Sequence, residues 1–465
     1  MSEYEKKLHA GNTFSDSIRN VMAGQSNAFS KLFPSQELPG IVRSFQEEPF
    51  KLMLGHYDQC RIGADYLNNT EFSILCIDSS GNFWAEKRKK GESKKLNSAL
   101  VIPPVEKGQT PFPVFEQISI SNKTIDFVMF LKYAFHYMSK AINNREVKFP
   151  SVIISDLAFS NVHSILDVCD KTNIRDYLSI SFNSLVHGKA NNLNTKLAIC
   201  ENHILPAMLK SSRGMEKKIL ADTVISGLML MFASESFQSA YGIWTNLVRI
   251  HCSREINDYA RQSVKSHSYD SSEADMYDDK LKDFVEDIED AEDIVKYGRR
   301  EAIRANSPFF HLFMREIEKV ENAESNDIPV SNSFWCPSLM KMLCKQYLAL
   351  FPLFGACFLP ESSKGLRNNA FVELYWQDLR RLFEKVPNRL LWPPAYLGLV
   401  YEEVQRKARE REFQKYIPNI RTGGKVSKQK RVSFANTSET ESHGKSLVQV
   451  RLLYCLVKSS PDSDL

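Results

Sequence analysis

Three acidic residues have the local settings from which a metal-dependent phosphoryl-transfer site is commonly assembled. Asp78 ends the apolar run 74–77, and Asp156 ends the run 152–155. The third acid, Glu373, lies much later in a stretch with a helical pattern. Carboxylates at buried strand ends cost free energy unless something offsets their charge. Two divalent cations, Mg²⁺ or Mn²⁺, would offset it and would stabilise the attacking and departing oxygens of a phosphoryl displacement.

Each acid has its own role in this expected chemistry. Asp78 would bridge both cations, while Asp156 and Glu373 would each hold one of them. The attacking group would be water for strand cleavage, or a DNA 3′ hydroxyl for strand joining. A single aspartate after an apolar strand is common, so the prediction depends on the ordered pair. Glu402 and Glu403 also lie on a later helix and compete with Glu373 for the third place.

Short apolar runs and amphipathic stretches surround the two aspartates. Strands joined by short connections form an antiparallel meander, whereas a strand reached through a crossover helix lies parallel to the first. The order βββ-α-β-α-β is that of a ribonuclease-H-like mixed sheet, and it places both aspartates at one sheet edge. The predicted elements are strands at 72–77 and from Phe83 onward with a turn at 79–82 between them, strands at 96–102 and 114–120, a helix at 124–142 capped by Thr124, a strand at 152–154, helices at 161–169 and 174–185, and a strand at 196–199.

Changes of pattern along the chain predict five segments. The fold class is α/β, a ribonuclease-H-like mixed sheet core with a large all-α insertion and a helical C-terminal part. The segments are an N-terminal accessory region (1–70), the first part of the catalytic core (71–203), an α-helical insertion with an acidic stretch (204–366), the C-terminal helices of the core (367–414), and a basic, then Ser/Thr-rich tail without expected fixed structure (415–465).

Charge is distributed unevenly, although the 465-residue chain has a net charge of only +4. The stretch 270–293 contains twelve acidic residues and two lysines, whereas 406–431 contains ten basic residues and two glutamates. A basic segment attracts phosphate, and an acidic one repels DNA or screens a basic groove. Solvated surface explains either stretch equally well. The basic residues expected to contact nucleic acid, or to serve as a nuclear-import signal, are Lys425, Lys428, Lys430 and Arg431.

The nine cysteines show no pairing at short spacing, and the N-terminus does not have the pattern of a secretory leader. We therefore expect an intracellular, reducing setting, with a nuclear protein or one held in the cytoplasm until import. The apolar stretches 219–233 and 348–359 are shorter than the roughly 20 residues that cross a bilayer. They predict buried helices, so no membrane partner is expected.

Several short motifs together resemble the Mutator-like transposases of the DDE class. The likeness covers roughly residues 70 to 410 and implies Asp78, Asp156 and Glu373 as metal-binding catalytic residues. It also implies DNA as the partner, no small-molecule cofactor, and leaves a homo-oligomer open. The hAT and Zisupton-type transposases have the same layout, so the superfamily is better supported than the family. The motifs are Leu75-Cys76-Ile77-Asp78-Ser79-Ser80-Gly81, Ala99-Leu100-Val101-Ile102-Pro103-Pro104, residues 111–116, Ile153-Ile154-Ser155-Asp156, Cys200-Glu201-Asn202-His203 and Asn368-Asn369-Ala370-Phe371-Val372-Glu373.

Cys200 and His203 are supporting residues in this resemblance, with His203 near the active site. The alternative is a buried cysteine and a histidine at a helix start, and no second Cys/His pair follows to complete a zinc site. Residues 1–70 also lack the ligands of a zinc finger. The second hypothesis is therefore a domesticated, catalytically inactive relic that acts as a DNA- or protein-binding module.

Overall fold

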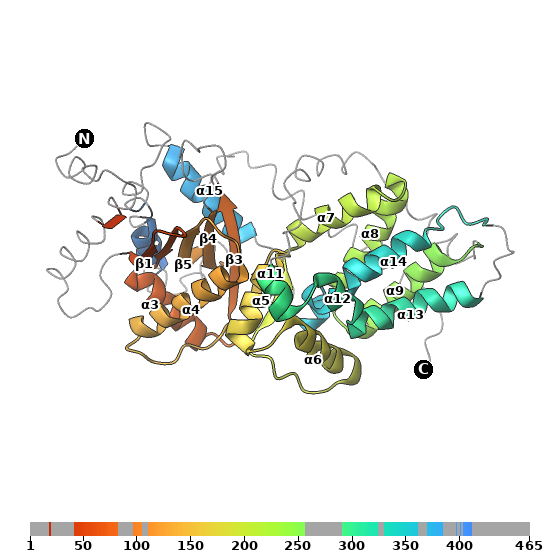
Figure 1. Cartoon of the computed structure of the whole chain (residues 1–465), viewed down its shortest axis with the longest axis horizontal. Helices are drawn as coiled ribbons and strands as arrows, with labels where there is room; N and C mark the ends of the chain where they lie inside the picture. The colour runs from red at the N-terminus through yellow and green to blue at the C-terminus, as the bar shows by residue number, and fades with distance from the viewer. Residues whose placement is uncertain are drawn as a thin grey trace, which may run out of the picture.

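The first half of the chain forms a mixed β-sheet, shown in the computed structural model of Figure 1. The structure describes residues 18–19, 41–81, 96–104, 110–255, 291–323, 330–360, 370–384, 397, 400 and 403–411. Within these ranges the architecture is α/β, with helices on both faces of the sheet and a larger helical part beyond its end. No helix in these ranges is long and apolar enough to span a bilayer.

Seven strands make up the sheet in the order β1-β2-β5-β4-β3-β6-β7. Strands β3, β4 and β5 form an antiparallel meander, and β6 and β7 continue the sheet in parallel to β3. The predicted meander and the parallel alignment after the crossover are confirmed. The strands are β1 (Val42–Gln46), β2 (Lys51–Leu54), β3 (Ile74–Gly81), β4 (Leu96–Ile102), β5 (Phe112–Ser119), β6 (Val152–Ser155) and β7 (Lys196–Ile199).

Two details of the predicted strands are wrong or lie outside the described residues. The turn predicted at 79–82 is wrong over 79–81, because β3 continues to Gly81 and pairs with β4 as far as Leu96. Asp78 therefore lies within a strand, with paired neighbours on both sides, and does not end it. The returning strand expected from Phe83 falls outside the described residues.

Residues 42–54 extend the same sheet beyond β5. Strand β2 pairs antiparallel with β5, and β1 pairs with β2. The helix that follows, α3 (Tyr57–Asn69), packs on β5 and on α4. This part of the expected accessory region is thus continuous with the core sheet.

Helices cover the two faces of the sheet unequally. One face is covered by helices including α4 (Thr124–Ala141), whose buried side chains pack with Leu75, Ile77 and Leu100. The opposite face is covered by α15 (Ala370–Glu384), which packs on β3 and β4 (Figure 1). The remaining helices of the first face are α5 (Phe159–Ile165), continued by a π-helical turn (Leu166–Asp170), and α6 (Ile174–His187).

The cap predicted for α4 is wrong by one residue. Lys123 occupies the N-cap position, and no side chain caps the helix there. Thr124 is the first helical residue, and its hydroxyl donates instead to the Asp293 carboxylate of a distant helix.

The second half of the described chain is helical, as predicted for 204–366. Its core is aromatic: Phe313 and Phe351 lie 5.5 Å apart between ring centroids, and the Trp244 indole donates to the Phe313 carbonyl at 3.0 Å. Most of the acidic stretch 270–293 lies outside the described residues. The helices are α7 (Glu201–Arg213), α8 (Lys218–Ala233), α9 (Phe237–Cys252), α11 (Ala291–Tyr297), α12 (Arg300–Ala305), α13 (Pro308–Ala323) and α14 (Pro337–Gln346), followed by the 3₁₀ turns η4 (Leu348–Leu353) and η5 (Ala356–Phe358).

Candidate active site

Asp78 and Asp156 are neighbours across the parallel pair β3 and β6. The register pairs Cys76 with Ile154, so the two aspartates each follow this pair by two residues. Asp78 is buried within β3, and Asp156 is half-buried directly after β6. The tight parallel pairing of two apolar strands therefore places both carboxyl groups at the same level of the sheet.

The Asp78 carboxyl lies in a negative environment. Burial raises its pKa well above the usual range, and the charges of Asp156 and Glu373 raise it further. The backbone N–H of Ser79 and the indole of Trp376 act in the opposite direction. The three acids chosen from the sequence thus come close enough for their charges to repel, although Glu373 is separated from Asp78 by nearly 300 residues of chain.

Asp156 is oriented by the first turn of the following helix. The Asn161 side-chain amide donates to Asp156 Oδ1 at 2.7 Å, and the Ser155 hydroxyl donates to the same oxygen at 3.2 Å. Asn161 is itself buried and also donates to the Ser155 hydroxyl at 3.1 Å. One oxygen of the carboxylate is therefore held by a buried polar pair from α5 and β6.

Glu373 reaches the site because α15 lies across the Asp78 face of the sheet. Val372, Trp376 and Leu379 form the buried stripe of this helix, at the spacing of one helix face. Glu373 is half-buried in the first turn, beside this stripe. One further contact, from Arg380 Nη2 to the Ser80 hydroxyl at 2.8 Å, joins α15 to β3.

The competing glutamates do not take this place in the described residues. Glu403 is buried in an ion pair with Arg406 at 2.5 Å and lies 3.7 Å from the Lys407 ammonium. Glu402 lies outside the described residues. The charge of Glu403 is therefore already offset by its own helix.

A fourth carboxylate, Glu116, was not assigned a role from the sequence. Register places Asp78, Ala99 and Glu116 side by side across β3, β4 and β5, so all three side chains emerge on the α15 face. Burial raises the pKa of Glu116 to about 7. The Tyr375 hydroxyl and the Gln59 amide oppose this shift, although neither completes a hydrogen bond to its oxygens among the described residues. The available signal was an acid inside the apolar run 112–118.

Cys200 and His203 occupy the end of the neighbouring strand. Cys200 is buried at the N-cap of α7, directly after β7, and burial together with the charges of Cys200 and Asp78 raises the pKa of the Cys76 thiol. His203 is half-buried in the first turn of α7, and its Nδ1 has no hydrogen-bond partner within the described ranges. The predicted nucleic-acid contacts Lys425, Lys428, Lys430 and Arg431 all lie outside the described residues.

The chemistry of the donor set suits a hard divalent cation, because all three acids supply oxygen and their mutual repulsion would be relieved by positive charge. Among the described residues, no group of three or more His, Cys, Asp or Glu side chains is arranged to hold a metal ion.

No known family model matches this chain, and no curated protein matches it significantly. The class of site is therefore defined here by its geometry, an acidic cluster at the centre of a mixed sheet.

Proposed function

We propose that the chain is a transposase-derived protein of the DDE class, related to the Mutator-like transposases, with a ribonuclease-H-like core. The proposed reaction is metal-dependent cleavage and transfer of DNA strands. The strand sequence β3-β4-β5-α4-β6-β7, with β3 central and β6 and β7 parallel to it, supports this core. The observation that carries the proposal is that the charges of Asp156, directly after β6, and of Glu373, on the distant helix α15, both act on the buried Asp78 carboxyl.

Each of the three acids would contribute to binding the metal ions. Asp78 and Asp156 would bind the cations from the sheet, with Asp156 held in orientation by Asn161. Glu373 would bind from α15. When bound, two cations supply charge stabilisation for the attacking and leaving oxygens of the phosphodiester. The buried Trp376 indole, which lies beside Asp78, would limit the access of water to the Asp78 carboxyl.

The test is metal-dependent cleavage of duplex DNA by the full chain and three conservative variants. We expect Asp78→Asn, Asp156→Asn and Glu373→Gln each to lose Mg²⁺- or Mn²⁺-dependent cleavage while retaining the fold. Asp176→Asn is the matched control, since Asp176 is an exposed carboxylate on α6, on the opposite face of the sheet. Undiminished cleavage in all three variants would refute the assignment.

A second function is favoured by the lack of zinc-finger ligands in residues 1–70. In a domesticated relic, the fold would serve as a DNA- or protein-binding module without catalysis. Calorimetric titration with Mn²⁺ separates the two functions. A catalytic site binds the cation in wild type and loses this binding in Asp78→Asn, whereas a relic shows no binding that depends on Asp78.

A further inference from the structure

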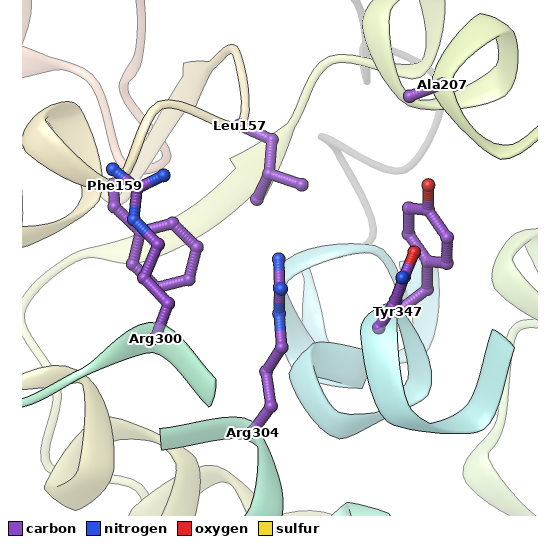
Figure 2. A pocket seen from close by; sticks show the side chains of 7 residues that line it. Leu157, Phe159, Ala207, Arg300, Arg304 and Tyr347 are labelled. Atoms are coloured by element: carbon purple, nitrogen blue, oxygen red, sulfur yellow. The ribbon is translucent and has the colours of Figure 1, made fainter. Parts of the chain in front are cut away.

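A second candidate site lies where the sheet meets the helical part of the chain. A small pocket opens there, and Figure 2 shows the side chains that line it. Leu157 comes from the loop after β6, which also holds Asp156, Phe159 begins α5, and Ala207 comes from α7. Arg300 and Arg304 come from α12, while Gln346 and Tyr347 close the pocket from the end of α14.

Two arginines are held in this pocket by one aromatic ring. The guanidinium carbon of Arg300 lies 4.8 Å from the centroid of Phe159, and that of Arg304 lies 5.6 Å from the same centroid. Figure 2 shows the Arg304 guanidinium directed into the space between Leu157 and Tyr347. Cation–π contacts restrict the guanidinium planes, so less conformational freedom is lost when a ligand binds them.

A third basic residue, Lys296, lies close to the same part of α5. The His163 imidazole stacks on Tyr297 at 4.0 Å between centroids, one turn beyond Phe159. Burial, together with the positive charges of Arg300 and Lys296, lowers its pKa to about 3. Lys296 itself pairs with Asp167 at 3.1 Å. The charges of Arg300 and Lys296 thus both reach the His163 side chain of α5.

The dimensions and polarity of the pocket select its ligand. The cavity volume is about 30 Å³, against roughly 10–15 Å³ for one water molecule by the same measure. This volume suits a phosphate group and is too small for a nucleobase. The Tyr347 hydroxyl, 3.3 Å from the Ser211 hydroxyl, adds a neutral donor to the charged ones. Planar guanidinium groups match phosphate oxygens in a bidentate manner.

We propose that Arg300, Arg304 and Tyr347 form a binding site for a backbone phosphate of the DNA strand that enters the acid cluster. This inference rests on the proposed function and extends it, because Leu157 in the pocket wall directly follows Asp156 in the chain. A strand bound at the acids would place a neighbouring phosphate at the arginines. The helical part of the chain would then position the substrate for the sheet.

The test is DNA binding by the full chain without divalent metal, measured by fluorescence anisotropy of a labelled duplex over a series of salt concentrations. Each phosphate contact that is lost lowers the slope of log K against log salt by about 1. We expect Arg300→Gln and Arg304→Gln each to weaken binding several-fold with this change of slope, and the double variant to lower the slope by about 2. Arg304→Lys keeps the positive charge but cannot make the two parallel hydrogen bonds of a guanidinium group. This variant should therefore bind DNA with an affinity between those of wild type and Arg304→Gln.

Lys132→Gln is the control, since Lys132 is an exposed cation on α4 that does not line the pocket, and its loss should leave affinity unchanged. Circular dichroism of each variant verifies the fold. Unchanged affinity and slope in a folded double variant would overturn the inference. The same result together with binding of inorganic phosphate at Arg304 would show a small-anion site instead, and would also overturn it.

The two proposals fail in different ways. If wild type cleaves DNA and the arginine variants bind it normally, only the phosphate site is refuted. If the arginines support binding but no cleavage occurs with Mg²⁺ or Mn²⁺, the catalytic assignment fails and the phosphate site remains as a property of a DNA-binding module.

Discussion

Replacing Glu116 by glutamine should stabilise the protein in a pH-dependent manner. Glu116 is buried at 2% exposure in the row that also contains Asp78, and its pKa rises from 4.5 to about 7. Glutamine has nearly the same shape and remains neutral. The substitution therefore removes the cost of a buried charge while it leaves the packing around Tyr375 and Gln59 in place.

The sign and size of the effect follow from the two pKa values. Below pH 4.5 the carboxyl is protonated in the folded and unfolded chains, so wild type and variant differ little. Between pH 4.5 and about 7 the unfolded chain releases a proton that the folded chain keeps, and wild type loses stability as pH rises. Above about pH 7, wild type bears the full free-energy cost of keeping the Glu116 carboxyl buried. At about 1.36 kcal/mol per pKa unit, it amounts to about 3 kcal/mol.

The assay is urea denaturation of wild type and Glu116→Gln at pH 4 and at pH 8, with the variant's gain in unfolding free energy compared between the two. We expect a gain near zero at pH 4 and about 3 kcal/mol at pH 8. An equal gain in unfolding free energy at both pH values, or a loss of stability at pH 8, would refute the assignment of Glu116 as a buried acid with a raised pKa.

A second buried glutamate supplies an internal control with the opposite sign. Glu316 accepts hydrogen bonds from the Tyr241 hydroxyl at 2.6 Å and the Lys319 ammonium at 2.7 Å. Burial acts to raise its pKa, but these partners prevail and the pKa is lowered. Glu316→Gln should therefore destabilise the protein at pH 8 and lose this effect as pH falls through the lowered pKa. At pH 8, the unfolding free energy should thus be higher than that of wild type in Glu116→Gln and lower than that of wild type in Glu316→Gln.

Three further predictions concern the site and its support. Asp78→Asn should raise the midpoint of unfolding at pH 8 without metal, because the pKa of Asp78 is raised, whereas Mn²⁺ should raise the midpoint of wild type alone; a parallel response of both proteins to Mn²⁺ would contradict metal binding at Asp78. Asn161→Ala should cost about 1–3 kcal/mol of stability and lower the cleavage rate without changing DNA affinity, since Asp156 Oδ1 then keeps only the longer hydrogen bond from the Ser155 hydroxyl; unaltered cleavage kinetics would show that the hydrogen bond from Asn161 has no positioning role. Gly63→Ala should destabilise by about 1–3 kcal/mol in thermal denaturation, because a Cβ there would lie 2.4 Å from Val114 Cγ1, and an unchanged midpoint would show that α3 shifts freely on β5.

Much of the sheet was predictable because its signals are local. Apolar runs with short connections indicated the meander, and the helix at 124–142 required a parallel return to the sheet. These two rules made Asp78 and Asp156 neighbours before any coordinate was known. The error at 79–81 has the same local origin. Ser-Ser-Gly has the composition of a turn, but pairing of Ser79 and Ser80 with Ser98 and Asn97 extends the strand.

The rest depended on contacts between distant parts of the chain. In the sequence, an acid within an apolar run has the same pattern whether its side chain faces solvent or the core. The burial of Glu116 could therefore be recognised only from the packing of β4 and α15 around it. The same holds for Arg300 and Arg304, which meet Phe159 across some 140 residues.

The sequence by itself determined the meander, the crossover helix and the parallel strand after it, and with them the pair Asp78 and Asp156. Hydrophobic periodicity and the lengths of the connections are local properties of the chain. Only the tertiary structure brought the charge of Glu373 to Asp78, by laying α15 across the face of the sheet on which Asp78 emerges. It also decided that an arginine pocket adjoins Asp156. Burial and the proximity of charges depend on the packing of the whole chain, and these two quantities set the chemistry of the site.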